Sequence, residues 1–375
     1  MTGLALPPEA TGLITIDLDA LQDNWRTLAK LVAPSECAGV VKADAYGLGA
    51  SEIIPALNLA GCRTFFIATP EEGRAARQLA PDARLFALDG LLGGSASLLR
   101  AANVTPVLSS LPEIEEWVAE ASQAGRPAPA ALQIDSGLNR LGLSEADIKA
   151  LVARPDLLAA LDIRLIMSHL ACADDPADPH NDAQRAEFDR RRALLPPAPA
   201  SLAASDGLML GKPFHYDLVR PGYALYGGQA FGGGATPVNP VVTLQARVLQ
   251  VRTLSAGDSV GYSATWQASR PTRLAVVAAG YADGLARALS AASGEPGGSV
   301  LVAGQLAPIV GRVSMDLITI DITDVAGNVT RGDLVTLIGP GLSIETLGRA
   351  AGTIGYEVLT RLGPRFVRSY TGGGA

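Results

Sequence analysis

Short apolar runs separated by longer segments fill the first part of the chain, and this alternation restricts the fold more than any other feature. Eight such runs lie at residues 38–42, 64–68, 84–88, 104–108, 131–135, 164–169, 200–204 and 217–227. The segments between them, such as 71–80 and 111–125, carry apolar residues at three- and four-residue intervals, which predicts amphipathic helices. Another helix is expected over 17–31, with Asp17 or Asp19 capping its start. Continuous apolar runs joined by helices are typical of buried parallel strands, and eight of them favour a closed (β/α)8 TIM-like barrel over an open sheet.

The pattern changes after residue 227. Residues 227–240 are rich in Gly and Pro and are interpreted as a linker. From residue 241 onward, alternating and β-branched runs are split by Gly, Pro and Asp, which predicts antiparallel strands, with one short helix over 343–353. We therefore expect a barrel domain over residues 1–240 and a mainly antiparallel β domain over residues 241–375.

Composition excludes several classes of protein. The formal net charge is −7 and no dense Lys/Arg cluster occurs, so a nucleic-acid partner is not expected. Cys37, Cys62 and Cys172 are too few and too widely spaced for a disulfide framework or a zinc site, and each is interpreted as a small buried hydrophobe. The N-terminus lacks the pattern of a signal peptide, and no long uncharged apolar stretch predicts a membrane span. We expect a cytoplasmic protein that binds no metal.

Polar residues follow the predicted barrel strands at the ends where barrel enzymes place their reactive groups. Lys42 ends the first run, where partial loss of water favours a neutral, nucleophilic amine that can form a Schiff base. The same residue could also be a lysine that extends from a strand end into water. Further polar residues at strand ends are Asp135, Ser168, His169, Ser205 and Arg220.

The segment around Lys42, VVKADAYGLGA (40–50), resembles the pyridoxal-phosphate lysine segment of bacterial alanine racemases. Six further segments resemble motifs of that family and follow its order: IDSGLNRLG (134–142), SHLACADD (168–175), RPGYALYG (220–227), GYADG (280–284), GRVSMD (311–316) and TIGYE (353–357). The family's architecture, a β/α barrel followed by a β domain, is the one read independently from the apolar pattern. The resemblance implies an enzyme that interconverts L- and D-alanine and supplies D-alanine for peptidoglycan.

The resemblance also implies roles for individual residues. Lys42 would bind pyridoxal 5'-phosphate covalently and act as the base on the D-alanine side. Tyr281 would be the second base and would come from the partner subunit of a homodimer. His169 would link Tyr281 to Arg220, which would face the pyridine nitrogen. Because a guanidinium keeps its proton, Arg220 would leave that nitrogen unprotonated and so limit delocalisation of the carbanion.

The remaining implied contacts concern the cofactor phosphate and the substrate. The family's phosphate-binding positions match Tyr46, Ser205, Gly222, Tyr223 and Tyr356. The Ser205 match is the weakest, because its segment reads AASDG where the family usually has A-N-S-A. Arg140 would contact the cofactor hydroxyl and the substrate carboxylate, and Met315 would line a small pocket that favours alanine, with serine as a slow substrate.

Two positions depart from the family pattern. Where the family often carries a carbamylated lysine, this chain has Gln133, so Arg140 loses an anionic partner. Gln133 is expected either to bond Arg140 directly or to leave room for a small anion. Leu48 replaces a common histidine, and this change is expected to be neutral because the mechanism assigns that position no proton.

Three other functions are weighed against this one. Amino-acid decarboxylases of similar architecture use a Gly-Glu-Pro-Gly-Arg loop and a C-terminal cysteine segment, and both are missing here. A periplasmic racemase of broad specificity would need a signal peptide. A non-catalytic pyridoxal-phosphate carrier would leave the β domain, with Tyr281 and Met315, unexplained.

Overall fold

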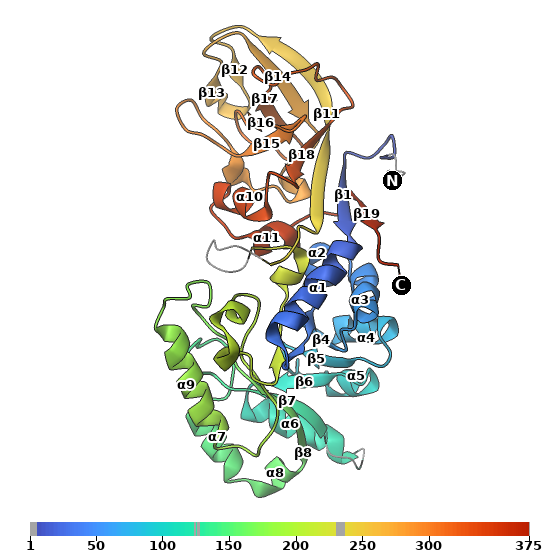
Figure 1. The fold of residues 1–375 in the computed structure, drawn as a ribbon, viewed down its shortest axis with the longest axis vertical. Helices are drawn as coiled ribbons and strands as arrows, with labels where there is room; N and C mark the ends of the chain where they lie inside the picture. The colour runs from blue at the N-terminus through green and yellow to red at the C-terminus, as the bar shows by residue number, and fades with distance from the viewer. Residues whose placement is uncertain (1–5, 124, 126–127, 230–236, 375) are drawn as a thin grey trace. The chain divides into compact units, whose positions relative to one another are not determined.

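The computed structural model describes residues 6–123, 125, 128–229 and 237–374, and Figure 1 shows their secondary structure. The chain divides into two compact units: Leu21–Asn239, and a second unit that combines the segment up to Ala20 with Pro240–Gly373. The second break lies where the linker was expected, although residues 230–236 of that linker are outside the described part. The N-terminal segment differs from the expected domain of residues 1–240. Its strand β1 (Gly12–Asp17) pairs with strands of the C-terminal unit, so the barrel unit begins only at Leu21.

The barrel unit contains a parallel sheet whose order follows the sequence, from β3 to β9. The strands of this unit are β2 (Glu36–Cys37), β3 (Gly39–Val40), β4 (Thr64–Ile67), β5 (Arg84–Ala87), β6 (Thr105–Leu108), β7 (Ala128–Gln133), β8 (Leu161–Met167), β9 (Ala200–Ser201) and β10 (Leu218–Val219). Each falls on or next to one of the eight predicted apolar runs. The predicted eighth run is mostly not a strand, because β10 ends after two residues and a 3-10 turn follows at Tyr223–Tyr226.

Backbone hydrogen bonds join the two ends of this sheet into a ring. Strand β10 pairs in parallel with β2, which directly precedes β3 in the chain. On the other side of β10, the amide of Arg220 donates to the carbonyl of Ala203, just beyond β9. The (β/α)8 TIM-like architecture expected from the sequence is therefore confirmed, with short closing strands.

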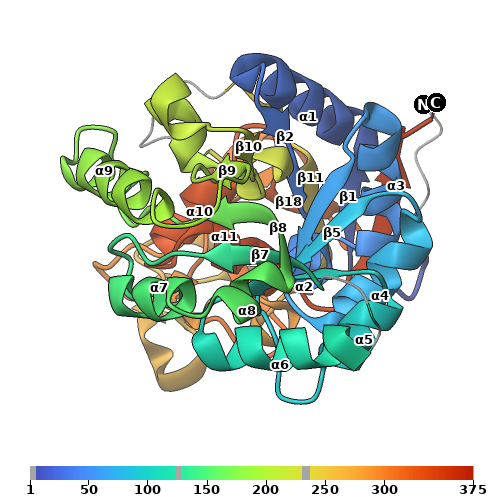
Figure 2. The ribbon, with the colours of Figure 1, turned by 90° about the horizontal axis from the view of Figure 1, so that it is seen from below.

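Helices surround the strands of the barrel unit, as Figure 2 shows for α3, α4, α5, α6 and α8. The helices are α1 (Leu18–Val32), α2 (Lys42–Gly47), α3 (Ala50–Ala60), α4 (Pro70–Leu79), α5 (Ala96–Ala101), α6 (Leu111–Gln123), α7 (Glu145–Val152), α8 (Pro155–Ala159) and α9 (His180–Arg192). Asp17 caps α1 through the amide of Ala20 at 2.9 Å, whereas Asp19 accepts from the amide of Gly373. Of the two caps that the sequence allowed, the structure selects Asp17.

The second unit is built on a mixed sheet that is mainly antiparallel, as expected. Its strands besides β1 are β11 (Val242–Leu254), β12 (Ser259–Val260), β13 (Trp266–Gln267), β14 (Thr272–Val277), β15 (Ser299–Val302), β16 (Gln305–Pro308), β17 (Ile318–Asp321), β18 (Leu334–Ile338) and β19 (Val367–Thr371). The long strand β11 pairs with β1, β18 and β14, with a register shift between Val248 and Gln250. The predicted helix near 343–353 is α10 (Ile344–Ala350), and a further helix, α11 (Gly355–Thr360), was not predicted.

Three smaller expectations concern the cysteines, membrane-spanning segments and metal sites. All three cysteines are free; Cys37 and Cys62 are buried, whereas Cys172 is only half-buried and so departs from the expected buried hydrophobe. Among the described residues, no helix has the length and apolar character needed to cross a bilayer. The described residues also contain no group of three or more His, Cys, Asp or Glu side chains arranged to hold a metal ion.

Candidate active site

Lys42 lies where β3 ends, at the first position of α2, and its side chain is half-buried. The turn that follows it is left-handed. Ala43, Asp44, Ala45 and Tyr46 all have φ between 52° and 59°. Side chains with a Cβ avoid this region at a cost of roughly 1–2 kcal/mol per residue, so four in succession need support from their surroundings. Such concentrated strain beside one lysine marks this turn as a functional element.

Two carboxylates support the left-handed turn. One oxygen of Glu72 accepts the amide of Ala43 at 2.8 Å, and the other accepts the amide of Ala68 at 2.7 Å. The Asp44 side chain accepts the amide of Ala50 at 2.7 Å, where α3 begins. Glu72 therefore connects the start of α4 and the end of β4 to the residue next to Lys42. The sequence analysis missed Glu72, because its only signal, Thr69 three residues earlier, indicates a helix start.

The last residue of this turn, Tyr46, packs against the loop that follows β10. Its ring centroid is 4.9 Å from that of Tyr226, and a Cβ added to Gly222 would lie 2.2 Å from the Tyr46 hydroxyl. Burial raises the pKa of Tyr46, so the phenol stays protonated. Gly222 is required at this point because no larger residue leaves room for the tyrosine.

Ser205 organises the same loop from the end of β9. Its buried hydroxyl accepts the amides of Gly222 and Ala224, each at 3.1 Å. Tyr223, which lies between them in the chain, is also buried. A hydroxyl and backbone amides gathered after the seventh and eighth strands are the groups that bind phosphate in barrel enzymes. The structure thus brings together Tyr46, Ser205, Gly222 and Tyr223, all named from the sequence.

Arg220 is buried beneath this loop. It donates to the carbonyl of Ser168 at 2.7 Å and to the hydroxyl of Ser201, and its guanidinium lies over the ring of Phe66. Burial lowers the pKa of Arg220 to about 9, so the group remains a cation at neutral pH. Among the residues the structure describes, no carboxylate pairs with it. A buried cation without an anion is costly unless a ligand supplies acceptors.

His169 interacts electrostatically with three cations of the barrel unit. Burial first, and then the positive charges of Arg220, Arg140 and Lys42, lower the pKa of His169 to about 3. The imidazole is therefore neutral at physiological pH. Lys42, His169 and Arg220 are among the residues that the sequence analysis expected at strand ends, whereas Arg140 lies in the loop after β7.

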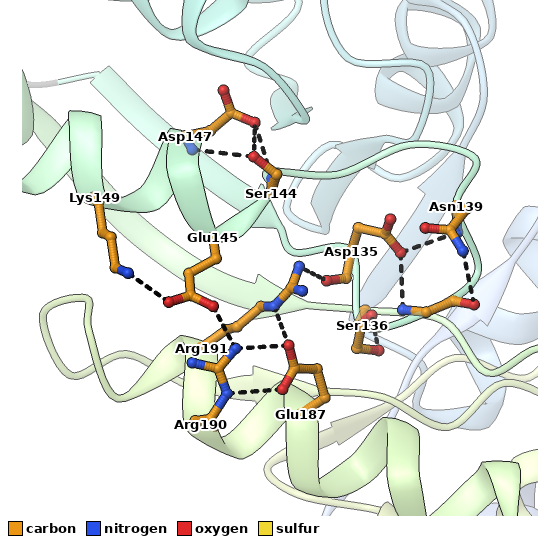
Figure 3. A network of polar contacts seen from close by, with 12 residues as sticks. Asp135, Ser136, Asn139, Ser144, Glu145, Asp147, Lys149, Glu187, Arg190 and Arg191 are labelled. Carbon is orange, nitrogen blue, oxygen red and sulfur yellow. Dashed lines mark hydrogen bonds and ion pairs between the residues drawn. The ribbon is translucent and has the colours of Figure 1, made fainter.

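The loop that carries Arg140 is fixed through its backbone. The Asp135 carboxylate accepts the amides of Gly137 and Asn139, each at 3.0 Å. Asp135 and Asn139 are shown in Figure 3. Arg140 itself is exposed and forms no hydrogen bond or ion pair within the described ranges. Gln133 donates to the carbonyl of Leu141 at 3.0 Å, so the expected direct bond from Gln133 to Arg140 is wrong. The other alternative, a small anion beside Arg140, remains a prediction.

In the second unit, Tyr281 and Met315 lie on two paired loops. The amide of Tyr281 donates to the carbonyl of Ser314 at 3.0 Å, and that of Ala282 donates to the carbonyl of Met315 at 2.9 Å. A Cβ on Gly280 would lie 2.3 Å from the Met315 carbonyl, so the close approach requires glycine. Both side chains point to solvent, with Tyr281 40% and Met315 54% exposed. An exposed phenol and an exposed thioether, held on two loops that are joined by backbone hydrogen bonds, are suited to contact another molecule.

An ion pair between a buried carboxylate and an exposed arginine holds the Tyr281 turn. Asp283 is 2% exposed and accepts the amide of Gly280 at 2.8 Å. Arg365 donates to both Asp283 oxygens, at 2.7 and 2.8 Å, and also to Asp316 at 2.7 Å. Arg365 thereby connects the Tyr281 loop to the Met315 loop. The sequence analysis missed Asp283 and Arg365, although Asp283 belongs to the GYADG motif that singled out the tyrosine.

Tyr356, the last of the residues named from the sequence, is half-buried on α11 of the second unit. The structure therefore gathers these residues in two sets. Lys42, Tyr46, Arg140, His169, Ser205, Arg220, Gly222 and Tyr223 belong to the barrel unit. Tyr281, Met315 and Tyr356 belong to the second unit.

Comparison with known proteins gives a consistent result over nearly the whole chain. An alanine racemase from Rhodospirillum rubrum is 48% identical, with 97% of this chain and 96% of the relative covered. A catabolic alanine racemase from Agrobacterium fabrum is 47% identical, with 96% and 92% covered. The crystal structure of the alanine racemase from Bartonella henselae, described as having covalently bound pyridoxal phosphate, matches with a TM-score of 0.91 and 41% identity, covering 96% of this chain and 100% of that chain.

Sequence profiles agree with these relatives. Residues 16–230 match the profile of the alanine racemase N-terminal domain, and residues 241–370 match that of the C-terminal domain. Together with the strand-end lysine, the cluster around His169 and the exposed tyrosine turn, these matches show that the chain belongs to the alanine racemase family.

Proposed function

We propose that this protein interconverts L-alanine and D-alanine with pyridoxal 5'-phosphate as its cofactor. The observation that carries the proposal is the loop beside the Lys42 turn, where the amides of Gly222 and Ala224 donate to the buried Ser205 hydroxyl and Gly222 packs against Tyr46. The cations Lys42, Arg140 and Arg220 of the same unit act electrostatically on His169. Three cations without a carboxylate partner among the described residues fit a ligand with several negative charges. A phosphorylated cofactor and an amino-acid carboxylate supply those charges.

The residues present fit this cofactor. Lys42 would hold it covalently through the amine, and the loop of Gly222 and Tyr223 with Ser205 would bind the phosphate. We assign Tyr46 and Tyr356 to the same phosphate. When bound, the cofactor draws electrons from the α-carbon of an attached amino acid and so makes its α-proton acidic.

The protein groups around the cofactor would then orient it and move the proton. Arg220 would donate a hydrogen bond to the ring nitrogen and would retain its own proton, because a cation with a pKa of about 9 is a poor acid at neutral pH. Arg140 would bind the cofactor hydroxyl and the substrate carboxylate. Lys42 would exchange a proton with the α-carbon on one face, and Tyr281 would do so on the other.

We further propose that the enzyme is a homodimer in which Tyr281 and Met315 complete the site of the partner subunit. Support comes from their exposure on a rigid pair of loops. The shared site can be tested by mixing the inactive variants Lys42→Ala and Tyr281→Phe, allowing their subunits to exchange, and measuring activity. A hybrid dimer contains one intact site only if each subunit supplies one of the two residues. Recovery of activity supports shared sites, and no recovery despite proven hybrids contradicts them.

The biological role we propose is supply of D-alanine for peptidoglycan in the cytoplasm. Free cysteines suit a reducing compartment. Some similar proteins are named catabolic, including one from Mesorhizobium japonicum that is 45% identical, so the role needs a direct test. Expression in a bacterium that requires added D-alanine should restore growth without it, and the Lys42→Ala variant should not.

A chiral assay tests the reaction. The cofactor-loaded protein should convert either enantiomer of alanine to an equal mixture, because the two enantiomers have the same free energy. The Tyr281→Phe variant should retain bound cofactor and lose most turnover. Release of carbon dioxide from an amino acid would instead indicate a decarboxylase. Bound cofactor without turnover of any amino acid would indicate a carrier.

A further inference from the structure

Helix α9 contacts the two loops that carry Arg140 and His169 in the barrel unit. It spans His180–Arg192 and lies outside the strands, so its side chains do not belong to the strand-end cluster. Three of its side chains bond to the loops after β7 and β8: Asn181, Gln184 and Arg191. A fourth, Glu187, accepts from Arg191 within the helix. None of the seven family motifs in the sequence includes α9.

Gln184 holds the loop that begins with His169. Its side-chain oxygen accepts the amide of Ala171 at 2.7 Å, and its side-chain nitrogen donates to the carbonyl of His169 at 3.2 Å. The residue is only 1% exposed, so water cannot replace these bonds. Asn181, one turn earlier, donates to the carbonyls of Cys172 and Asp175 and extends the same support.

Arg191 holds the other loop from the opposite end of the helix. It donates to the carbonyl of Asp135 at 2.6 Å, and its Nε donates to Glu187 at 2.6 Å, as Figure 3 shows. Asp135 is the residue whose carboxylate fixes the turn leading to Arg140. Because Gln133 does not hold Arg140, the backbone contact from Arg191 is an important support for the loop.

We propose that α9 is a positioning helix whose Gln184 and Arg191 set the places of His169 and Arg140 independently. The inference rests on the proposed function for the roles of those two residues. Arg191 acts through Arg140, which would bind the substrate carboxylate, so its loss should raise KM. Gln184 acts through His169, which would govern proton transfer through Arg220 and Tyr281, so its loss should lower kcat.

The variants Arg191→Met and Gln184→Met test this, since methionine keeps a long unbranched side chain but removes the hydrogen bonds. Arg192→Gln is the matched control. Arg192 follows Arg191 on the same helix and pairs with Asp189, without a contact to either loop. If Gln184→Met does not fold, Gln184→Asn replaces it. Arg191→Lys serves as the conservative variant, because an ammonium can still donate to Asp135.

Two readouts separate positioning from general stability. Amide hydrogen exchange on the full-length, cofactor-loaded protein should accelerate over 135–142 in Arg191→Met and over 169–175 in Gln184→Met, and elsewhere remain unchanged. Steady-state kinetics with alanine should show about a tenfold rise in KM for Arg191→Met and about a tenfold fall in kcat for Gln184→Met, as expected for small displacements of binding and proton-transfer groups. Arg191→Lys should recover part of the loss.

The proposal is overturned if exchange in both loops matches the control, or if both variants change KM and kcat alike in proportion to a lower melting temperature. The exchange arm does not depend on turnover. A wild-type protein that does not racemise alanine would therefore refute the proposed function, while the exchange pattern still decides whether α9 holds the loops.

Discussion

The left-handed turn after Lys42 leads to a quantitative prediction about Glu72. Four residues with φ between 52° and 59° cost roughly 4–8 kcal/mol at about 1–2 kcal/mol each. The bond from the amide of Ala43 to the Glu72 carboxylate is charge-assisted, and such bonds contribute about 1.5–3 kcal/mol. Glu72→Ala should therefore destabilise the turn by about 2 kcal/mol. We take a value in the lower part of the range for charge-assisted bonds because the Glu72 carboxylate is only half-buried.

This change should appear as weaker cofactor binding. If only the left-handed turn places Lys42 correctly, a loss of about 2 kcal/mol lowers the apparent affinity for pyridoxal phosphate by about 30-fold. The assay is titration of the apoprotein with the cofactor, followed by the visible absorbance of the covalent adduct. Glu72→Gln, whose amide oxygen accepts one bond instead of two, should lose less.

Glu71→Ala is the matched control for this titration. Glu71 precedes Glu72 in the first turn of the same helix, but it pairs with Arg74 at the surface. Its loss should change the affinity less than about twofold, because exposed ion pairs contribute little. Equal affinities for Glu72→Ala and the wild type would refute the reasoning that Glu72 holds the turn.

Three further predictions concern other parts of the site. Ser205→Ala removes the acceptor of two buried amides, so phosphate-dependent cofactor affinity should fall about tenfold in the same titration. Asp283→Asn breaks a bidentate bond to Arg365, and kcat should fall more than cofactor affinity, because the loosened turn carries Tyr281 rather than phosphate ligands. The pKa of His169 is lowered to about 3, whereas an unfolded histidine binds a proton below about pH 6.5. The unfolding free energy should therefore fall as the pH falls from about 6.5 toward 3. Denaturant titrations at several pH values should show that the unfolding free energy of His169→Asn depends less on pH than that of the wild type.

The sequence predicted the barrel strands well, because buried parallel strands carry continuous apolar runs that need no knowledge of their partners. It included the N-terminal segment in the barrel domain, whereas the structure places it in the second unit. GLITID, the strand β1, pairs with β11 and β19, and nothing in its own residues reveals partners so distant in the chain. In the second domain the sequence predicted antiparallel strands in general, but it did not locate the loop with Met315 between β16 and β17.

The candidate site shows a similar limit. Family motifs identified the residues with reactive side chains, including Lys42 and His169. They did not reveal Glu72, Gln184 or Arg191, which act through backbone groups of other segments. The left-handed turn could not be predicted either, since only the aspartate among Ala, Asp, Ala and Tyr is enriched at positive φ, and one such residue does not predict four in succession.

The central claim is that Lys42 and Tyr281 transfer protons on opposite faces of the same α-carbon. Its most direct test is proton NMR of L-alanine incubated in D2O with the cofactor-loaded protein, followed by chiral analysis of the recovered alanine. The account predicts loss of the α-proton signal together with equal amounts of deuterated D- and L-alanine. Retention of the α-proton would contradict it. The control is the visible absorbance of the bound cofactor, which should be intact in the wild type and absent in Lys42→Ala.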